Sequence, residues 1–324
     1  MKNKIKKSTH DLGYKPYFLL IMLVFLGFSS TTSSGQNDLS GTCWQNTFGS
    51  FLRINTHDLK TGVFRGTYGS TTGSVGIYSV IGQSVKCTRP LISVISSLSF
   101  VVSWNNIAAA ATDPSENWTS TMSGTFNVFN SFGEARKMEL VNVISAPTEF
   151  EAVKIFQPGN LPQSQTFIEV TSGECSKINM EAPKLITGSG TATDDKFIFE
   201  LLGQWKTNTL SGILPLPSII IEEVLPRGES YEKLKYYEIK GTCSYMDRIL
   251  PFVGMVSPYI IDDNGHFSFA LSITTTDIQE GKSIKSFSGV STGSMPAKIN
   301  IFYTNTEGFK LFDGFLSGVS YYKN

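Results

Sequence analysis

The sequence predicts an all-β protein made of two consecutive eight-stranded antiparallel up-and-down β-barrels, the second a degenerate copy of the first. Three observations predict this fold class. Short segments alternate between apolar and polar residues, turn residues recur about every 10–15 positions, and a set of motifs from the first half returns in the same order in the second half. Eight such strands close into a barrel whose interior holds one small ligand.

The first 35 residues have the composition of a secretory signal peptide. Four lysines before residue 8 form a basic segment, and an apolar run of about 11 residues, Phe18 to Phe28, lies further along. This run is shorter than the roughly 20 apolar residues of a membrane-spanning helix. The length favours cleavage near Gly35–Gln36 over an uncleaved signal anchor. We therefore expect a secreted, extracellular protein that makes no membrane contact after cleavage.

Composition and charge narrow the range of functions. The chain has 324 residues, with 27 Lys and Arg against 27 Asp and Glu, and residues 1–35 account for five of the lysines and one aspartate. The remainder is mildly acidic, by about four charges, which predicts no nucleic-acid partner. Its length of about 290 residues suits two domains.

The four cysteines, Cys43, Cys87, Cys175 and Cys243, suggest two disulfides in a secreted chain. Four cysteines allow three pairings. We favour Cys43–Cys87 and Cys175–Cys243, which place one bridge in each barrel. The sequon at Asn117 predicts a glycosylation site if it lies at the surface.

The first barrel is expected over residues 36–172, with about eight strands between Leu39 and Val170. Ser99–Trp104 and Trp118–Phe126 show the clearest period-two alternation. A polar connector rich in Ser, Gly and Thr is expected over residues 173–195. The second barrel is expected over residues 196–324, where four motifs repeat those of the first: Leu202–Trp205, Ile239–Cys243, Ser268–Ile273 and Ser286–Gly289. Trp44 and Trp205 are expected to fill the ends of their barrels.

The stretch from Leu39 to Ser74 places small polar residues on the interior face of three short strands. Buried polar groups need partners, and a polar ligand is one way to supply them. Trp44-Gln45-Asn46, Gly49-Ser50 and Gly66-Thr67-Tyr68 have a spacing that resembles the biotin-binding start of avidin and streptavidin. The resemblance covers about 130 residues of the first barrel and is much weaker in the second.

The resemblance implies a biotin site in the first barrel. Asn46, Ser50 and Tyr68 match the residues that donate to the ureido carbonyl, and Ser70 matches the hydroxyl that accepts from a ureido N–H. Further residues match the loop over the valeryl chain, the aromatic wall and the hydroxyl near the thioether sulfur. They are Ser74, Trp104, Ser120 and Met122.

Several positions depart from the family pattern. Met122, Val141 and Val153 stand where the family has Trp, and the acidic acceptor of the second ureido N–H has only Gln163, Gln165 and Asn160 as candidates. Because aromatic rings contribute on the order of 1 kcal/mol each beyond their buried area, we expect biotin to bind more weakly by several orders of magnitude. In the second copy, Thr207, Cys243 and Ile273 replace the Asn, the Tyr and the first Trp, which predicts no biotin site there.

Two other functions remain open, and catalysis is not expected. The lost Trp residues and the degenerate second copy also fit an extracellular structural or interaction module, and a greasier interior would fit a lipocalin-like carrier of an apolar ligand. The mature chain keeps His57 and His266 without a nucleophile–base arrangement, and it has no phosphate loop or metal motif. We expect no cofactor.

Barrels of this family pair through their final strands, so the chain is expected to form a homo-oligomer or to pair its two barrels internally.

Overall fold

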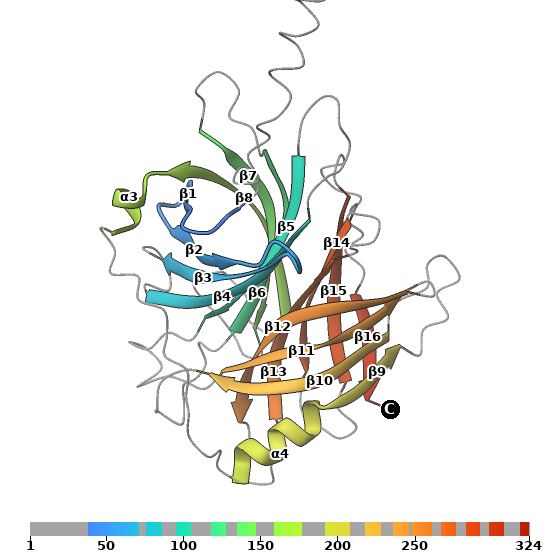
Figure 1. Ribbon diagram of the computed structural model, residues 1–324. Helices are drawn as coiled ribbons and strands as arrows, with labels where there is room; N and C mark the ends of the chain where they lie inside the picture. The colour runs from blue at the N-terminus through green and yellow to red at the C-terminus, as the bar shows by residue number, and fades with distance from the viewer. Residues whose placement is uncertain are drawn as a thin grey trace, which may run out of the picture. The chain divides into compact units, whose positions relative to one another are not determined.

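A computed structural model describes most of the chain after residue 37 (Figure 1). The described residues are 38–70, 76–85, 95–104, 118–127, 135–146, 159–176, 192–207, 218–227, 236–245, 248–260, 267–276, 283–291, 298–307 and 318–323. The chain divides into Met1–Gln36 and Asn37–Asn324, and all described residues lie in the second of these units. The expected signal peptide, Ser74, Cys87, Asn117, Val153 and His266 lie outside the described residues.

The first barrel has the eight strands that the sequence predicts. They run antiparallel in chain order, and β1 pairs with β8 to close the ring. The strands are β1 (Cys43–Asn46), β2 (Phe51–His57), β3 (Val63–Ser70), β4 (Gly76–Val85), β5 (Ile95–Trp104), β6 (Trp118–Asn127), β7 (Lys137–Ala146) and β8 (Gly159–Val170).

Alternation along each strand separates an apolar interior from a hydroxyl-rich exterior. On β5, Leu98, Phe100 and Val102 belong to the barrel core, whereas Ser99, Val101 and Ser103 alternate with them and point outward. Trp44 is fully buried at one end of the interior, its indole Nε1 donates to Thr42 Oγ1 at 2.9 Å, and the Arg136 guanidinium lies over its ring. The expectation that Trp44 packs in the core is confirmed.

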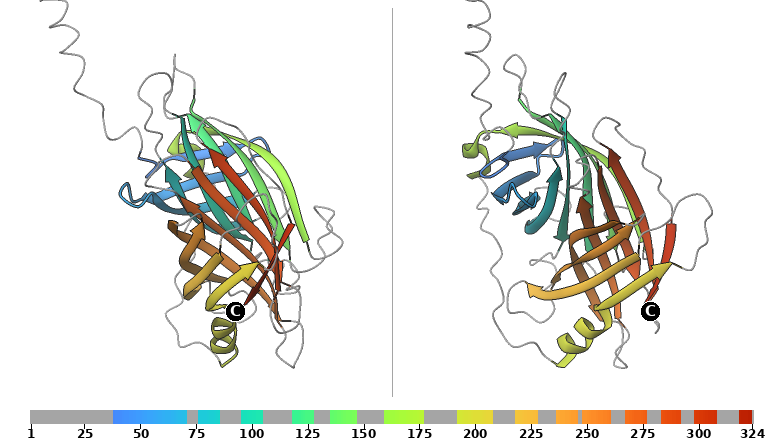
Figure 2. Two further views of the ribbon diagram at one scale, coloured as in Figure 1. Left: turned by 90° about the vertical axis from the view of Figure 1, so that its right-hand side faces the viewer. Right: turned by 45° about the vertical axis from the view of Figure 1, so that its right-hand side comes forward.

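The second barrel is also closed, by a shorter first strand. β9 (Gly203–Thr207) pairs over three residues with β10 and over three with β16. The remaining strands are β10 (Ser218–Arg227), β11 (Tyr236–Tyr245), β12 (Arg248–Ile260), β13 (Phe267–Thr276), β14 (Ser283–Ser291), β15 (Lys298–Glu307) and β16 (Gly318–Lys323). Figure 2 shows both rings of strands from two further sides.

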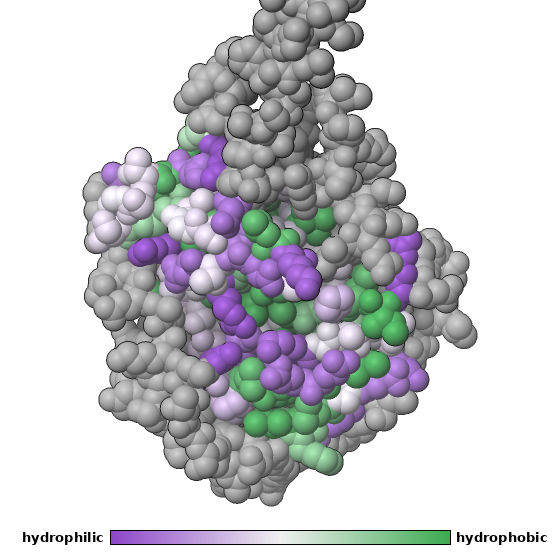
Figure 3. Space-filling view, viewed as in Figure 1, coloured by the Kyte–Doolittle hydropathy of each residue, from purple (hydrophilic) through white to green (hydrophobic). Residues whose placement is uncertain are grey.

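The described residues include two short helices where the sequence predicts none. They are α3 (Ser172–Ser176), directly after β8, and α4 (Ala192–Leu201), directly before β9. Phe197 and Leu201 of α4 join the core of the second barrel, and the Phe197 ring lies 4.9 Å from that of Tyr237. Figure 3 shows hydrophobic surface at the end of the molecule where α4 lies, and Phe199 of α4 is exposed. Neither described helix is long or apolar enough to cross a membrane.

The two barrels share an irregularity that supports an internal duplication. Ile54 pairs with Gly66 beside a register shift in β2, and Ile221 pairs with Gly241 beside a register shift in β10. A Cβ atom on either glycine would collide with a carbonyl oxygen of the neighbouring strand. Glycine is therefore required at the same point of both folds, where a bulged strand approaches closely.

The strand register corrects one equivalence expected from the sequence. The motif match places Ile273 at the position of Trp104. In the structure Ile273 pairs with Gly254, as Phe100 pairs with Gly82, so Ile273 is equivalent to Phe100. The error arises because a serine-and-apolar alternation matches itself at several offsets, whereas the glycines fix a single register.

The disulfide differs from the expected pairing. Cys43 on β1 is bonded to Cys175 on α3, with their Cα atoms 6.1 Å apart, and Cys243 is buried apart from this bridge. The pairings Cys43–Cys87 and Cys175–Cys243 are therefore wrong. Cys43 lies beside Val170 at the end of β8, and α3 follows immediately, so the closure of the barrel brings Cys175 to Cys43. The side chain of Cys243 instead packs inside the second barrel.

Small hydroxyl side chains on the outer faces of the barrels bond to one another within the chain. The hydroxyl pairs are Ser99–Ser286 at 2.6 Å, Ser103–Ser257 at 3.0 Å, Ser145–Ser288 at 2.7 Å and Thr119–Ser272 at 2.9 Å. These contacts centre on β5, β6 and β7 rather than on the final strand β8. Serine and threonine are small enough to let two sheet faces approach closely, which accounts for the difference from the expected pairing.

A buried carboxylate also joins the barrels. Glu238 on β11 accepts hydrogen bonds from Arg65 on β3 at 2.5 and 2.8 Å and from Arg227 on β10 at 3.1 Å. Burial acts to raise the pKa of Glu238, but the hydrogen bond and charge of Arg65, together with Arg227, hold it below its usual value. Beside it, the Tyr236 hydroxyl donates to Ser79 Oγ at 2.5 Å.

Candidate ligand-binding site in the first barrel

The turn between β1 and β2 fixes the orientation of Asn46. The Asn46 Oδ1 atom accepts from the backbone N–H groups of Phe48 at 3.0 Å and Ser50 at 2.9 Å. Gly49 closes this turn with a φ of 83°, a left-handed conformation that favours glycine. Because the carbonyl of the side chain is held by the turn, its amide nitrogen must point into the barrel.

That amide nitrogen brings together residues from three strands. Asn46 Nδ2 donates to Tyr68 Oη on β3 at 3.0 Å and to Gln165 Oε1 on β8 at 3.2 Å. Asn46, Ser50, Tyr68 and Gln165 are all buried. Gln165 is one of the three acceptor candidates from the sequence. Gln163 is half-buried, and the side chain of Asn160 lies outside the description.

The Tyr68 phenol remains protonated at neutral pH. Burial raises its pKa to about 12, although hydrogen bonds to Ser50 and Asn46 oppose the shift. Its oxygen already accepts from Asn46, so its own O–H can donate to an acceptor inside the barrel. Asn46, Ser50 and Tyr68 thus form one cluster, as the sequence predicts.

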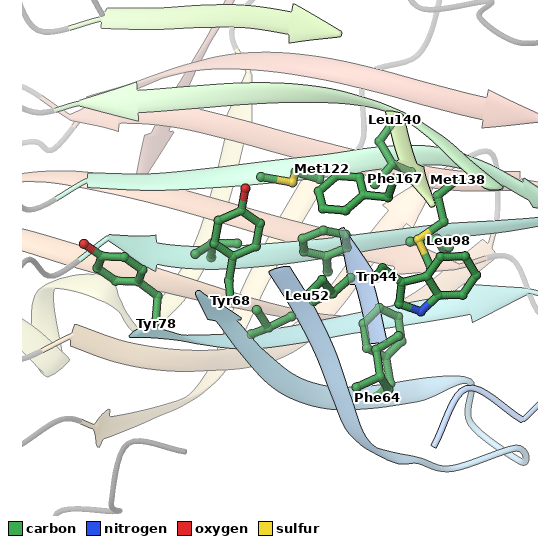
Figure 4. Close-up of a cluster of buried hydrophobic side chains, with 14 of the residues drawn as sticks. Trp44, Leu52, Phe64, Tyr68, Tyr78, Leu98, Met122, Met138, Leu140 and Phe167 are labelled. Atoms are coloured by element: carbon green, nitrogen blue, oxygen red, sulfur yellow. The ribbon is translucent and has the colours of Figure 1, made fainter. Parts of the chain in front are cut away.

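Four aromatic rings form a wall next to this cluster. Trp104 lies at ring-centroid distances of 5.2 Å from Tyr68, 5.0 Å from Tyr78 and 6.3 Å from Trp118. Its indole Nε1 donates to Ser120 Oγ at 2.8 Å. The predicted residues Trp104 and Ser120 therefore contact each other. Figure 4 shows the hydroxyls of Tyr68 and Tyr78 at the end of the cluster opposite Trp44.

The other predicted residues also line the interior of the barrel where they are described. Met122 is fully buried in the core, and Ser70 is buried on β3, two residues after Tyr68. Ser74 lies outside the described residues.

Val141, which was matched to a family Trp, faces outward from β7. Its neighbour Leu140 is in the barrel core, and successive residues of a strand point to opposite faces.

Sequence reasoning missed three interior residues. Tyr78 and Trp118 add rings to the wall, and Asn142 places an amide on β7. Period-two alternation in β7 could have identified Asn142, because it places Met138, Leu140 and Asn142 on the interior face. The alignment on Glu134-Ala135-Arg136 instead assigns the other face of β7 to the interior.

The equivalent positions of the second barrel are apolar or small. By strand register, Cys243 replaces Tyr68, Leu250 replaces Tyr78, and Phe287 replaces Met122. These side chains are buried, and Phe197 of α4 packs against Phe269 in the same core. The described interior of this barrel thus lacks the amide–phenol cluster of the first.

His57 forms structural contacts. His57 Nδ1 accepts from the Leu39 N–H at 3.1 Å, and its Nε2 lies 2.8 Å from Ser84 Oγ. Burial lowers the pKa of His57, while Asp38 and Asp58 oppose the shift. Among the residues that the structure covers, no three His, Cys, Asp or Glu side chains are grouped to hold a metal.

Comparison with known proteins finds avidin-type barrels. The chain is similar to xenavidin (20% identity, TM-score 0.30), to a low-affinity mutant of shwanavidin (19%, 0.29) and to a biotin binding protein from chicken (16%, 0.31). These matches cover 42%, 41% and 42% of this chain and 99%, 95% and 98% of the other chain, respectively. No protein-family model and no curated protein matches.

Proposed function

We propose that the first barrel binds a small neutral molecule of the cyclic urea class, biotin or a relative, without chemical conversion. The observation that carries the proposal is the buried contact of Asn46 with Tyr68 and Gln165 beside the Trp104 wall. A phenol O–H and an amide in a dry interior polarise a carbonyl strongly, because the local dielectric constant is low. The rings supply an apolar surface for the rest of the ligand.

Affinity for biotin is expected to lie several orders of magnitude below that of the strongest family members. Gln165 is neutral where the resemblance implies an anionic acceptor, and hydrogen bonds to a charged group are roughly twice as strong as neutral ones. Met122 takes the place of a ring. Each 1.4 kcal/mol lost corresponds to about a tenfold weaker affinity.

Biotin binding can be measured through the fluorescence of the indole rings in the wall. Asn46→Ala and Tyr68→Phe should each weaken binding by about 1–3 kcal/mol, because each leaves a buried polar partner unsatisfied. Cys243→Ala, at the equivalent level of the second barrel, is the matched control and should leave the affinity unchanged. Wild-type affinity in both first-barrel variants would place the ligand elsewhere and refute the proposal.

Secretion is part of the same proposal. An oxidising compartment suits the Cys43–Cys175 disulfide. Expression in a secreting host followed by mass spectrometry of the medium should give a chain that begins near Gln36, with or without a glycan at Asn117. A chain retained in the membrane fraction at full length would favour a signal anchor instead.

A second function deserves a test because a separate observation favours it. The hydroxyl contacts and the Glu238 cluster join the barrels within the chain, as suits an extracellular structural or interaction module. Under that hypothesis the protein binds neither biotin nor a fatty acid probe. A lipocalin-like carrier would bind the fatty acid probe and not biotin, so one competition assay with both ligands separates the three functions.

A further inference from the structure

The interior of the first barrel contains a second polar group, apart from the Asn46 cluster. Asn142 on β7 is 1% exposed, and its side-chain oxygen Oδ1 has no hydrogen-bond partner among the described residues. A buried acceptor without a partner is uncommon in folded proteins, because its desolvation is not compensated. At this interior position no described residue provides the donor that Asn142 Oδ1 lacks, and a bound ligand could provide it.

The strand register places this oxygen inside the barrel and near the proposed ligand. Leu140 and Ile144, two residues to either side of Asn142, belong to the barrel core, so Asn142 shares their inward direction. It lies directly opposite Met122 on β6 and Gln163 on β8. Gln165 pairs with Leu140, one inward position along from Asn142, so the two amides are diagonal neighbours about 7–8 Å apart at the backbone.

We propose that Asn142 is a specificity-determining residue that selects a ligand with a hydrogen-bond donor on its second ring. This inference rests on the proposed function, since it assumes that Asn46, Tyr68 and Gln165 hold a urea group at the end of the barrel. The part of the ligand beyond that urea then reaches the level of Met122 and Asn142. The second ring of biotin is a thioether ring and has no N–H to offer there, whereas a second urea or an amide ring does.

Two small bicyclic probes of similar shape separate these ligands. Glycoluril is a urea ring fused to a second urea ring, and the tail-free nucleus of biotin is a urea ring fused to a tetrahydrothiophene ring. Calorimetric titration of the secreted chain should show that glycoluril binds at least about tenfold more tightly than the biotin nucleus, the ratio expected for one added buried hydrogen bond.

Asn142→Leu should abolish this preference. The variant removes the acceptor and keeps the branching of the side chain at Cγ, so its affinity for glycoluril should fall at least about tenfold, while its affinity for the biotin nucleus stays within about threefold of wild type. Ile144→Val, on the inner face of the same strand, removes a methyl group but no acceptor. It should keep the wild-type ratio and serves as the control.

The unfolding midpoint of the ligand-free variants provides an independent readout. Asn142→Leu should raise the midpoint above that of wild type, because an unpartnered buried acceptor is replaced by an apolar group. A lower midpoint would show that Oδ1 is satisfied in the free protein and would overturn the inference. Equal binding of both probes, unchanged by Asn142→Leu, would overturn it and leave the urea site standing. If neither probe nor biotin binds the wild-type chain, the urea site and the inference both fail.

Discussion

The two barrels have the same strand order and the same bulge and glycine in their second and third strands. Their interiors differ, because one contains a polar cluster and the other has apolar or small side chains at the equivalent positions. In the first, Asn46, Tyr68 and Gln165 form a buried hydrogen-bonded cluster. In the second, the positions of Tyr68 and Tyr78 hold Cys243 and Leu250, and a helix contributes Phe197 to the core. A barrel of this kind therefore keeps its fold through backbone constraints, whereas the ligand that it can bind depends on a few inward-facing side chains.

The largest expected effect concerns the disulfide, which the structure assigns to the first barrel. Replacing Cys43 and Cys175 together by Ala should lower the free energy of unfolding of this barrel by about 4 kcal/mol, because the bridge closes a long loop of 132 residues in the unfolded chain. Cys243→Ala should cost about 1 kcal/mol. Denaturant titrations of both variants measure the difference, and equal losses would contradict the assignment.

Paired glycine substitutions test whether the barrels are true structural repeats. Gly66→Ala and Gly241→Ala each drive a methyl group into a backbone carbonyl, of Arg53 and of Ile220 respectively. Each should lower the free energy of unfolding by about 2–3 kcal/mol. Gly173→Ala, where the added methyl meets only a distant threonine oxygen, is the control. A large loss at only one of the two equivalent glycines would break the comparison.

Glu238 tests how strongly the barrels depend on each other. Glu238→Gln should cost about 1–2 kcal/mol, a value reduced by the partial exposure of Arg65. Glu223→Gln, in the largely exposed pair with Lys240, should cost less than about 0.5 kcal/mol. Denaturant unfolding at neutral pH measures both.

The same carboxylate predicts a pH dependence. Because the pKa of Glu238 is lowered in the folded state, its contribution is present above the unfolded value of 4.5 and is lost as the pH falls through the folded pKa. Glu238→Gln should therefore flatten the acid limb of the stability profile below about pH 4.5. An acid limb that is as steep in the variant as in wild type would show that other carboxylates determine it.

The smallest expected effect is that of His57. Burial lowers its pKa in the folded state, so the unfolded chain binds the proton first and stability should decrease as the pH falls below about 6.5. Protonation of Nδ1 would also break the hydrogen bond from Leu39. His57→Gln should remove the slope between about pH 5 and 6.5, measured as the thermal midpoint across that range.

Period-two alternation and turn spacing were enough to predict the first eight strands, because each strand has one buried and one outward face. Asn46, Ser50 and Tyr68 were placed in one cluster by the resemblance of their motifs to those of avidin and streptavidin. The pairing of Cys43 with Cys175 was not, because it depends on β8 returning beside β1. Asn142 was missed for a different reason: alternation with the core residues Met138 and Leu140 places it inside the barrel, but the alignment on Glu134-Ala135-Arg136 gives β7 the opposite parity.

We propose that the first barrel binds a small urea ligand and that the second barrel does not. Calorimetric titration of the secreted chain with biotin tests it most directly. We predict a saturable heat with about one site per chain that Asn46→Ala weakens by about 1–3 kcal/mol and Cys243→Ala leaves unchanged. Two sites per chain, or no heat at high micromolar biotin, would contradict the account.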